Sequence, residues 1–341
     1  MVCAENTDEV VTSLNTTLPQ PRARPLVAIV GPTAVGKSAL ALRLAPRWQG
    51  EIVSADSRYI YRFMDIGTAT PTPEELATVP HHLINILDPD QPFSLAEYQE
   101  LAYRAIEDIL ARGRLPFLVG GTGQYVWAVL EGWQVPHVPP DPALRARLAE
   151  RARIAGPLAL HRELAAVDPA AAARIHPHNV RRVIRALEVY YHTGQPISAQ
   201  QTARPPDYQT LIIGLTLPRA ELYRRIDQRF DEMVARGWVE EVRRLLERGY
   251  SPDLPSMTSL GYREIVRYLR GECTLDAALR RVKAQTHRFA RQQYTWFRLD
   301  DPRIHWLTAG PEAEAQAEAL IRDFLAALPA PWPVPALSDV A

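Results

Sequence analysis

The eight residues from Gly31 to Ser38 constrain the fold of this chain more than any other part of its sequence. Their order, Gly-Pro-Thr-Ala-Val-Gly-Lys-Ser, matches the pattern G-x-x-x-x-G-K-[ST] of phosphate-binding loops. The apolar run Leu26–Val30 precedes the motif and is typical of a buried parallel strand. Apolar residues at Leu40 and Leu44 indicate the start of a helix behind it. A strand, a glycine turn and a helix in this order predict a site for a pyrophosphate-containing ligand.

The chemistry of this loop comes from its backbone and from two side chains. A helix N-terminus presents unpaired N–H groups and a positive dipole end to an anion. Lys37 adds a full positive charge, and the hydroxyl group of Ser38 can reach a magnesium ion on the phosphates. We therefore expect Mg²⁺ as cofactor, with Ser38 as its protein ligand. The expected diphosphate-binding residues are Gly31, Pro32, Thr33, Ala34, Val35, Gly36, Lys37 and Ser38.

Size and composition narrow the class of protein. A chain of 341 residues is expected to form about two domains, or one large domain with an insertion. Its 39 basic and 39 acidic side chains balance, so a nucleic-acid site would have to be a local patch. Two cysteines exclude a disulfide framework, and no apolar run reaches the length of a membrane span. We expect a cytoplasmic protein without a membrane segment.

The pattern along the chain predicts an α/β protein: a P-loop NTPase-like three-layer core around a parallel sheet, with an all-helical insertion domain. Proline-rich boundaries and a stretch without credible strands define the insertion. The expected segments are a disordered arm at 1–23, the core at 24–137 and 207–328, the insertion at 138–206, and a disordered tail at 329–341. Core helices are expected near 95–112, 219–236, 239–248, 262–269, 275–295 and 312–328, with late strands at 210–217 and 304–307.

Two further strand ends carry candidate site residues. The strand that begins at Glu51 leads to Asp56, and ligands of parallel sheets bind outside the carboxyl ends of the strands. Asp56 is therefore expected beside the phosphate loop if the two strands are neighbours. The strand Leu115–Val119 leads to Gly120-Gly-Thr122 instead of the aspartate that an ordinary nucleotide hydrolase would place there for magnesium. This ending counts against an ordinary ATPase, although a small-molecule kinase stays open.

Two predicted helices have basic faces. One contains Arg181, Arg182 and Arg185, and the other contains Arg280, Lys283, His287 and Arg291 at spacings of three or four. Such faces are often only solvated, but two of them in a chain of zero net charge favour a local polyanion surface. In a third helix the spacing does not decide whether Arg225 or Arg229 faces the phosphate loop. The pair His81-His82 is expected to lie in a loop.

Taken together, these motifs resemble the tRNA dimethylallyltransferase family, the bacterial tRNA isopentenyltransferases. The resemblance covers residues 26–300 in the correct order. Its motifs are Gly31–Ser38, Asp56-Ser57, Met64-Asp-Ile-Gly-Thr-Ala69, Pro80-His-His-Leu-Ile84, Val119-Gly-Gly-Thr122, Arg185-Ala-Leu-Glu-Val189, Thr193-Gly194, Leu260-Gly-Tyr-Arg263 and Thr295-Trp-Phe297.

The resemblance implies transfer of a dimethylallyl group from dimethylallyl diphosphate to the exocyclic N6 of an adenosine. In the family this base follows the anticodon on its 3′ side, in tRNAs that read codons beginning with U. By the same resemblance the catalytic residues are Asp56 as general base, Thr122 near the reacting base, and Lys37 and Arg229 on the diphosphate. The alternative that the residues leave open is a P-loop kinase of a small metabolite, and a third is a non-catalytic RNA-binding protein.

The resemblance also implies a tRNA anticodon stem-loop as partner, clamped by the helical insertion, and we expect the enzyme to act as a monomer. The positions implied to contact tRNA are Asp56, Ser57, Arg58, Tyr59, Thr122, Arg145, Arg181, Arg182, Val183, Ile184, Arg185, Thr258, Ser259, Leu260, Gly261, Tyr262 and Arg263. Several positions depart from the family pattern. Tyr59 stands where glutamine is common, Thr70 where lysine is, Asn85 where aspartate is and Gln124 where leucine is, and Arg291-Gln-Gln293 replaces Lys-Arg-Gln.

Overall fold

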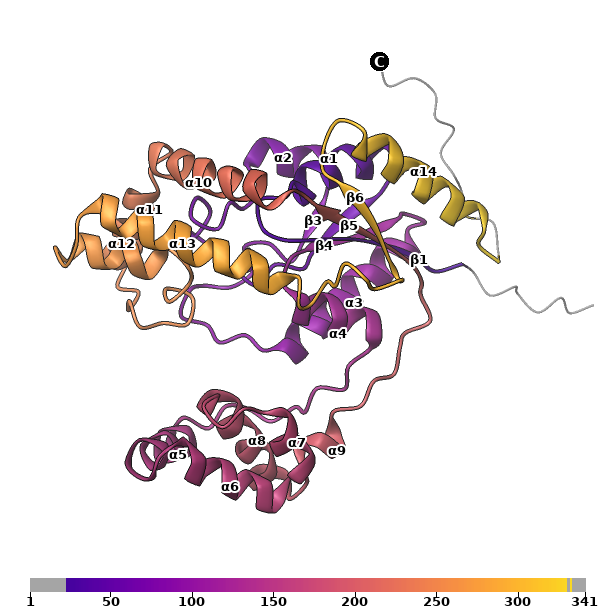
Figure 1. Cartoon of the computed structure of the whole chain (residues 1–341). Helices are drawn as coiled ribbons and strands as arrows, with labels where there is room; N and C mark the ends of the chain where they lie inside the picture. The colour runs from indigo at the N-terminus through magenta and orange to yellow at the C-terminus, as the bar shows by residue number, and fades with distance from the viewer. Residues whose placement is uncertain (1–22, 330–331, 333–341) are drawn as a thin grey trace, which may run out of the picture.

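The computed structural model describes residues 23–329 and 332, and its core is an α/β sheet (Figure 1). Six parallel strands are arranged in the order β3-β2-β4-β1-β5-β6. The predicted fold class is thereby confirmed. The expected arm at 1–23 and tail at 329–341 lie almost wholly outside the described residues. The strands are β1 (Pro25–Val30), β2 (Glu51–Ser54), β3 (His81–His82), β4 (Pro116–Gly120), β5 (Gln209–Thr216) and β6 (Ile304–Thr308).

Alternate side chains of the central strands divide the hydrophobic core between the two faces of the sheet. On β1, Val27 and Ile29 face one core, while Ala28 and Val30 face the other. Because both faces are covered, the central strands are apolar throughout instead of alternating with polar residues. The first core is closed by α1 (Lys37–Arg47), α10 (Arg219–Ala235) and α14 (Ala313–Ala326), and the second by α3 (Leu95–Ala111) and α4 (Gly123–Glu131).

Three more helices pack beside α10 at one end of the sheet (Figure 1). They are α11 (Trp238–Glu247), α12 (Tyr262–Leu269) and α13 (Leu275–Gln293), each within two residues of its predicted range. The fully buried Trp238 lies at their centre, against Phe230 and Tyr262. A short helix, α2 (Pro73–Thr78), begins with a capping box at Thr72 and Glu75. No helix in the described part of the chain is both long and apolar enough to cross a membrane.

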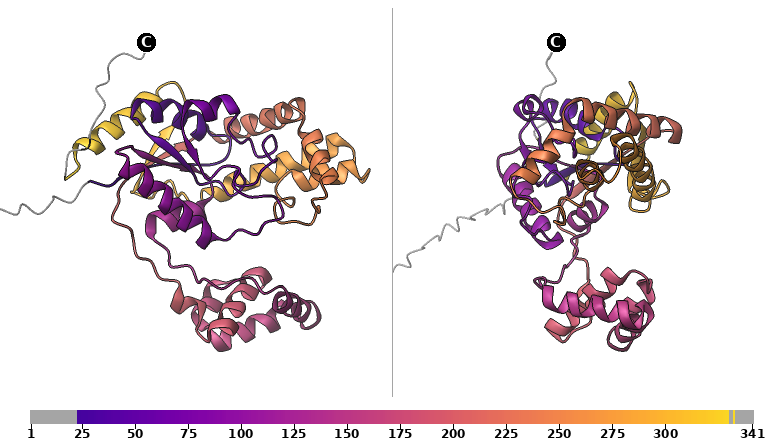
Figure 2. Two further views of the ribbon diagram at one scale, coloured as in Figure 1. Left: turned by 180° about the vertical axis from the view of Figure 1, so that it is seen from behind. Right: turned by 90° about the vertical axis from the view of Figure 1, so that its left-hand side faces the viewer.

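A separate bundle of helices lies apart from the core and is joined to it by two extended segments (Figure 2). Its members all lie between Pro136 and Pro206 and bury their own apolar cluster around Leu148, Leu164 and Leu187. The two connecting segments pair at their base, since Gln134 N donates to Thr202 O at 2.7 Å and Arg204 N to Gly132 O at 2.9 Å. The helices are α5 (Pro142–Ala155), α6 (Pro157–Val167), α7 (Pro169–Arg174), α8 (Val180–Thr193) and α9 (Ile197–Gln200).

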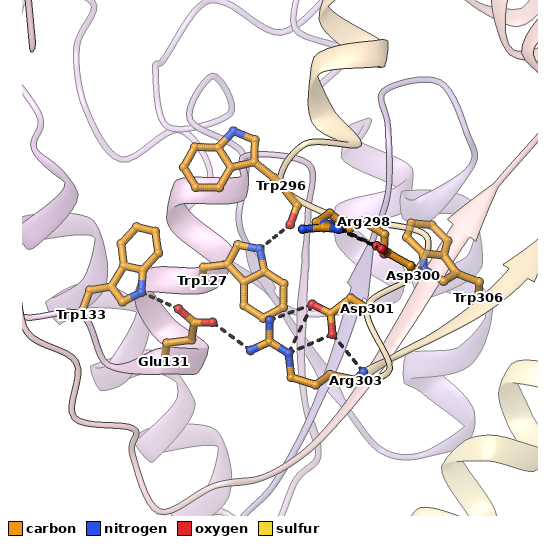
Figure 3. Close-up of polar contacts among 9 residues, drawn as sticks. All are labelled: Trp127, Glu131, Trp133, Trp296, Arg298, Asp300, Asp301, Arg303 and Trp306. Carbon is orange, nitrogen blue, oxygen red and sulfur yellow. Dashed lines mark hydrogen bonds and ion pairs between the residues drawn. The ribbon is translucent and has the colours of Figure 1, made fainter. Parts of the chain in front are cut away.

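An aromatic cluster fixes the first connecting segment to the core (Figure 3). The indole N–H of Trp133 donates to Glu131 at 2.7 Å, and its ring lies 6.3 Å from that of Trp296. The guanidinium group of Arg303 bonds to Glu131 at 2.9 Å and lies 4.3 Å from the ring centroid of Trp127. Trp127 in turn donates to the carbonyl oxygen of Trp296 at 2.8 Å. The insertion therefore leaves the core from an anchored point.

One local prediction is wrong. His81 and His82 form the edge strand β3 instead of a loop, because they pair with Ile52 and Val53 of β2. The imidazole Nε2 of His82 lies 2.7 Å from a carboxylate oxygen of the buried Glu51. A two-residue strand is too short to show any periodicity, so the sequence pattern gives no signal for it. The contact with Glu51 assigns His82 to packing at the sheet edge.

Candidate active site

The phosphate-binding motif forms the turn between β1 and α1, as predicted. Helix α1 begins at Lys37, and its N-cap Gly36 has φ 107° and makes no side-chain cap. A residue with a side chain would be strained at this angle. Since no side chain occupies the N-terminus of α1, its N–H groups remain available to an anion. Gly31 is equally restricted, because a Cβ there would lie 2.4 Å from the carbonyl oxygen of Leu215.

Asp56 faces this loop by a route that the sequence did not predict. Strands β1 and β2 are not neighbours, since β4 lies between them. Strand β4 ends in two glycines, and a Cβ on Gly120 would lie 2.1 Å from Ala55 O. A Cβ on Gly121 would lie 3.3 Å from the Lys37 ammonium nitrogen. Because Gly120 and Gly121 have no side chains, the segment that carries Asp56 and the phosphate loop can both pack directly against the end of β4.

The pKa of Lys37 is influenced by its burial and by two charged side chains, Asp56 and Arg229. Its ammonium group donates a hydrogen bond to Pro32 O at 2.8 Å. Burial lowers the pKa of Lys37 to about 8, while the carboxylate of Asp56 acts in the opposite direction and the guanidinium group of Arg229 reinforces the decrease. A buried ammonium group has lost its water shell, so a bound anion stabilises its charged form strongly. The site is therefore electrostatically suited to a diphosphate.

Hydrogen bonds between Ser57 and Thr122 connect the loop after β2, which carries Asp56, to the loop after β4. Ser57 N donates to Thr122 Oγ1 at 3.0 Å, and Thr122 N donates to Ala55 O at 3.2 Å. The Asp56 carboxylate accepts a hydrogen bond from Arg58 N at 2.9 Å. These bonds hold Thr122 next to the segment that carries Asp56.

The structure distinguishes the two arginines of α10. Arg225 pairs with Glu221 at 2.9 Å, within its own helix. Arg229 instead reaches Thr33 Oγ1 of the phosphate loop at 3.5 Å and Thr68 O at 3.3 Å. Arg229 is thus the guanidinium group that faces the proposed anion. Thr68 belongs to the segment 64–69, so this segment sets the direction of the Arg229 side chain.

Gln293 is a structural member of the site that the sequence did not single out. Its side-chain oxygen accepts from Thr33 N at 2.8 Å, and its amide nitrogen donates to Gly121 O at 2.8 Å. One buried side chain at the end of α13 therefore ties the phosphate loop to the end of β4. The two contacts span 260 and 172 residues of sequence. No local pattern reports contacts at that separation.

A small cavity lies beside the phosphate loop. Its walls include Ser38 and Tyr59 as well as the apolar side chains of Ile84 and Val119. Burial raises the pKa of the Tyr59 hydroxyl group, although Arg229 acts in the opposite direction. The phenol is therefore neutral at physiological pH. Tyr59 is half-buried, and its predicted contact with RNA stays a prediction.

Ser38 is the one predicted magnesium ligand, and it is exposed in the first turn of α1. In the part of the chain that the structure describes, no group of three or more His, Cys, Asp or Glu side chains could hold a metal ion. A single hydroxyl group fits a magnesium ion that keeps several water ligands and is carried by substrate phosphates. It does not fit an ion that the protein would hold by itself.

The segment 258–263 alternates between surface and interior. Thr258, Leu260 and Arg263 are exposed. Ser259, Gly261 and Tyr262 are buried, and contact of these positions with tRNA stays a prediction. The Tyr262 hydroxyl group donates to Glu241 at 2.7 Å, and the same carboxylate accepts from Ile66 N at 2.6 Å and Gly67 N at 3.0 Å. Tyr262 thereby supports the segment 64–69 that directs Arg229.

The arginines of the insertion have two different environments. Arg145 and Arg185 both bond to the fully buried carboxylate of Glu188, at 2.7 Å and 2.6 Å. Burial would raise the pKa of Glu188, but hydrogen bonds from Arg145, Asp141 N and Arg185 bring it to about 2. Arg185 also donates to Val138 O at 3.0 Å. These two arginines therefore anchor the connecting segment to α8.

The predicted RNA-contact positions on α8 divide between the interior and the surface of the insertion. Val183 and Ile184 lie in the hydrophobic core of the insertion. Arg181 and Arg182, in the first turn of the same helix, are exposed. The helix has one face toward the core of the insertion and one toward solvent. Contact of these positions with RNA stays a prediction, for which the exposed arginines have the available side chains.

The basic face of α13 packs against α10, which changes its interpretation. Lys283 pairs with Asp231 at 2.7 Å, and His287 pairs with Asp227 at 2.8 Å. Arg291 bonds to the hydroxyl group of Tyr223, and Arg280 pairs with Asp276. These partners neutralise much of the face. Lys283, His287 and Arg291 thus contact α10, whereas the pair of Arg280 lies within α13 and is exposed. The polyanion surface along this stripe stays a prediction.

Comparison with known proteins places these features in a family. The sequence model of the family described as "IPP transferase" matches residues 59–300. The chain is 59% identical over 302 residues to a tRNA dimethylallyltransferase of Roseiflexus sp. (strain RS-1), covering 88% of this chain and 99% of that protein. It is 51% identical over 310 residues to a tRNA dimethylallyltransferase of Dehalococcoides mccartyi (strain ATCC BAA-2266 / KCTC 15142 / 195), covering 91% and 95%.

Two solved structures are also similar. The tRNA isopentenylpyrophosphate transferase of Bacillus halodurans superimposes with a TM-score of 0.66 at 43% identity, covering 88% of this chain and 96% of that one. A eukaryotic dimethylallyltransferase described as acting on tRNA superimposes with a TM-score of 0.74 at 27% identity, covering 89% and 80%. The similarity therefore extends over the core and the insertion together.

Proposed function

The chain belongs to the IPP transferase family, and from this premise we propose the reaction that its site carries out. The enzyme prenylates tRNA. In our proposal it transfers the dimethylallyl group of dimethylallyl diphosphate to N6 of the adenosine on the 3′ side of the anticodon, in tRNAs that read codons beginning with U. The observation that carries the proposal is that two segments meet at Gly120 and Gly121: Ala55, which precedes Asp56, lies beside the first glycine and Lys37 beside the second.

The phosphate loop holds the leaving group. The bond between C1 of the dimethylallyl group and its diphosphate oxygen breaks, which builds negative charge on diphosphate and positive charge on the allylic carbon. The N–H groups at the start of α1, with Lys37 and Arg229, would stabilise the developing negative charge. We propose that Thr33 and Ser38 add hydroxyl contacts. A magnesium ion bound to the diphosphate and Ser38 would supply further charge neutralisation.

Asp56 is proposed to act as the general base. The lone pair of the adenine amine is delocalised into the ring, so the amine attacks carbon well only as it loses a proton. In our proposal N6 forms the new bond to C1, and its proton passes to the Asp56 carboxylate. Thr122 lies on the same side of the site through its hydrogen bonds with Ser57, and we assign it a contact with the reacting base. Diphosphate leaves with the electron pair of the broken bond.

Ile84 and Val119 supply apolar surface next to Ser38 and Tyr59, and we propose that the dimethylallyl group packs against them. The anticodon loop would approach from the opposite side, where its target base is unpaired and is extruded into a pocket at little cost. We propose contacts from Thr258, Leu260 and Arg263 on the core and from Arg181 and Arg182 on the insertion, because these predicted positions are exposed. Every proposed residue lies on one chain, so a monomer is sufficient.

A P-loop kinase would use the same loop but different surroundings. Strand β4 ends in glycines instead of a magnesium-binding aspartate, and a kinase has no use for the tRNA-facing insertion. A labelling experiment separates the two activities. With dimethylallyl diphosphate labelled in its carbon chain, we expect label to appear in tRNA. ATP turnover with a metabolite pool and no label in RNA would contradict the proposal.

A further inference from the structure

We propose that Phe63, Arg244 and Arg248 form a second RNA-binding site, which stacks an unpaired nucleotide of the tRNA substrate on Phe63 and binds its phosphate with the two arginines. This inference depends on the proposed function for the identity of the RNA. The three residues line one pocket, between the segment before Met64 and the exposed side of α11. None of the predicted catalytic or RNA-binding residues belongs to this pocket.

The backbone of Phe63 is strained in a way that only a function or a rigid setting would preserve. Its φ angle is 68°, in the left-handed region that favours glycine and that bulky residues rarely adopt. The side chain is nevertheless large and apolar, and 41% of its surface is exposed. Strained residues of this kind concentrate at functional sites. An exposed aromatic ring held in a fixed direction provides a platform for a nucleic-acid base.

The guanidinium group of Arg248 lies 4.1 Å from the centroid of the Phe63 ring. Arg244 lies one turn earlier on α11, and both arginines are exposed. Within residues 23–329 and 332, no carboxylate lies within ion-pair distance of either arginine, whereas Arg243 beside them pairs with Glu240. Two cations without acidic partners next to an exposed ring match the phosphate and the base of one nucleotide.

The two carboxylates of the pocket do not cancel these charges by direct pairing. Asp65 accepts a hydrogen bond from the side chain of Asn85 at 2.9 Å. Glu241 is buried and accepts from Ile66 N, Gly67 N and the Tyr262 hydroxyl group. Both carboxylates are thus engaged with the protein. Through Glu241 the pocket adjoins the segment 258–263, whose exposed residues face the same substrate in our proposal.

The test is the affinity of a fluorescein-labelled tRNA anticodon stem-loop for the full-length chain, measured by anisotropy. Phe63→Asn is the informative variant, because asparagine tolerates a left-handed backbone and so leaves the fold intact. We expect it to weaken binding about 5- to 100-fold, the range of one base–aromatic stack, with little change in Tm. Phe63→Tyr keeps the ring and is expected to restore the affinity.

The arginine is tested by a matched pair on one helix. Arg248→Gln is expected to lower the slope of log K against log salt by about one, whereas Arg243→Gln leaves it unchanged. Equal stem-loop affinity of Phe63→Asn and wild type would overturn the inference, and so would a loss of Tm without a loss of affinity. Free AMP that binds as tightly as the stem-loop would make this a nucleotide site instead. If wild type fails to prenylate tRNA at all, the proposed function fails separately.

Discussion

Asp56 and Lys37 show how two residues with separate sequence contexts become one site. Each was predicted at the carboxyl end of a parallel strand, where ligands bind. The sequence placed them side by side only on the condition that their strands are neighbours, and β4 lies between these strands. Their approach depends instead on Gly120 and Gly121, whose missing side chains leave room for both loops. The glycines were noted in the sequence, but the strand order that gives them this role was not predictable from local patterns.

The titration of Lys37 gives a prediction for the pH dependence of the enzyme. Its pKa of about 8 means that the free enzyme loses this positive charge as the pH rises through 8. We expect kcat/KM for dimethylallyl diphosphate to fall above pH 8, because this parameter reports ionisation of the free enzyme. In Lys37→Arg the guanidinium group stays charged, so the variant should be slower but lack the alkaline fall. A fall of the same shape in both proteins would contradict the assignment.

The same pKa has a consequence for stability whose sign is opposite to that of a salt-bridged lysine. The unfolded chain titrates near 10.5 and the folded chain near 8. Between these values the unfolded state binds more protons, so this residue makes the free energy of unfolding increase with pH. Below pH 8 the charged Lys37 supports binding of the anion but lowers the free energy of unfolding. Above pH 8 the neutral side chain destabilises the fold less and binds the anion less well. Such a trade-off between binding and stability is expected of a buried charged group that binds a ligand.

At the scale of elements, the helices of the core were largely predictable because each has one apolar face. The predicted helix at 262–269 coincides with α12, and the one at 95–112 differs from α3 by one residue. Long amphipathic helices give a strong periodic signal. The packing of α13 against α10 was not predictable, since the ion pair Lys283–Asp231 joins residues 52 positions apart. The basic stripe was visible in the sequence, but its contacts with α10 were not.

The link from α11 to α12 predicts an effect on substrate binding at a distance from the diphosphate. Tyr262→Phe removes the hydroxyl donor to Glu241, which holds Ile66 and Gly67. The segment 64–69 then directs Arg229 less well through Thr68. We expect KM for dimethylallyl diphosphate to rise about tenfold, as for loss of one charge-assisted hydrogen bond. Steady-state kinetics with saturating tRNA measure this change.

A second tyrosine provides the control. The hydroxyl group of Tyr103 donates to Val129 O at 3.0 Å, away from the site. Tyr103→Phe should lower the free energy of unfolding by about 1 kcal/mol, as a hydrogen bond of this kind typically does, without changing KM. If both variants raise KM to the same extent, the effect of Tyr262 is general destabilisation and not the positioning of Arg229.

At the scale of the whole molecule, the chain consists of a core and an insertion. The core has its own two hydrophobic clusters and the insertion a third. Their connection is specific, since the linkers pair near Trp133 and Arg185 fixes the first linker to α8. We infer that the insertion grips the anticodon stem-loop while the core presents Asp56 and the diphosphate to its base.

The most direct test of this account is the rate of a single turnover with Asp56→Asn, with tRNA affinity measured in parallel. Asparagine keeps the size of the side chain but cannot accept the N6 proton. We predict that transfer of labelled dimethylallyl to tRNA slows by about 10²–10⁴-fold, the usual contribution of a general base, while the affinity for tRNA is retained. An unchanged transfer rate would remove Asp56 from the mechanism and contradict the central claim.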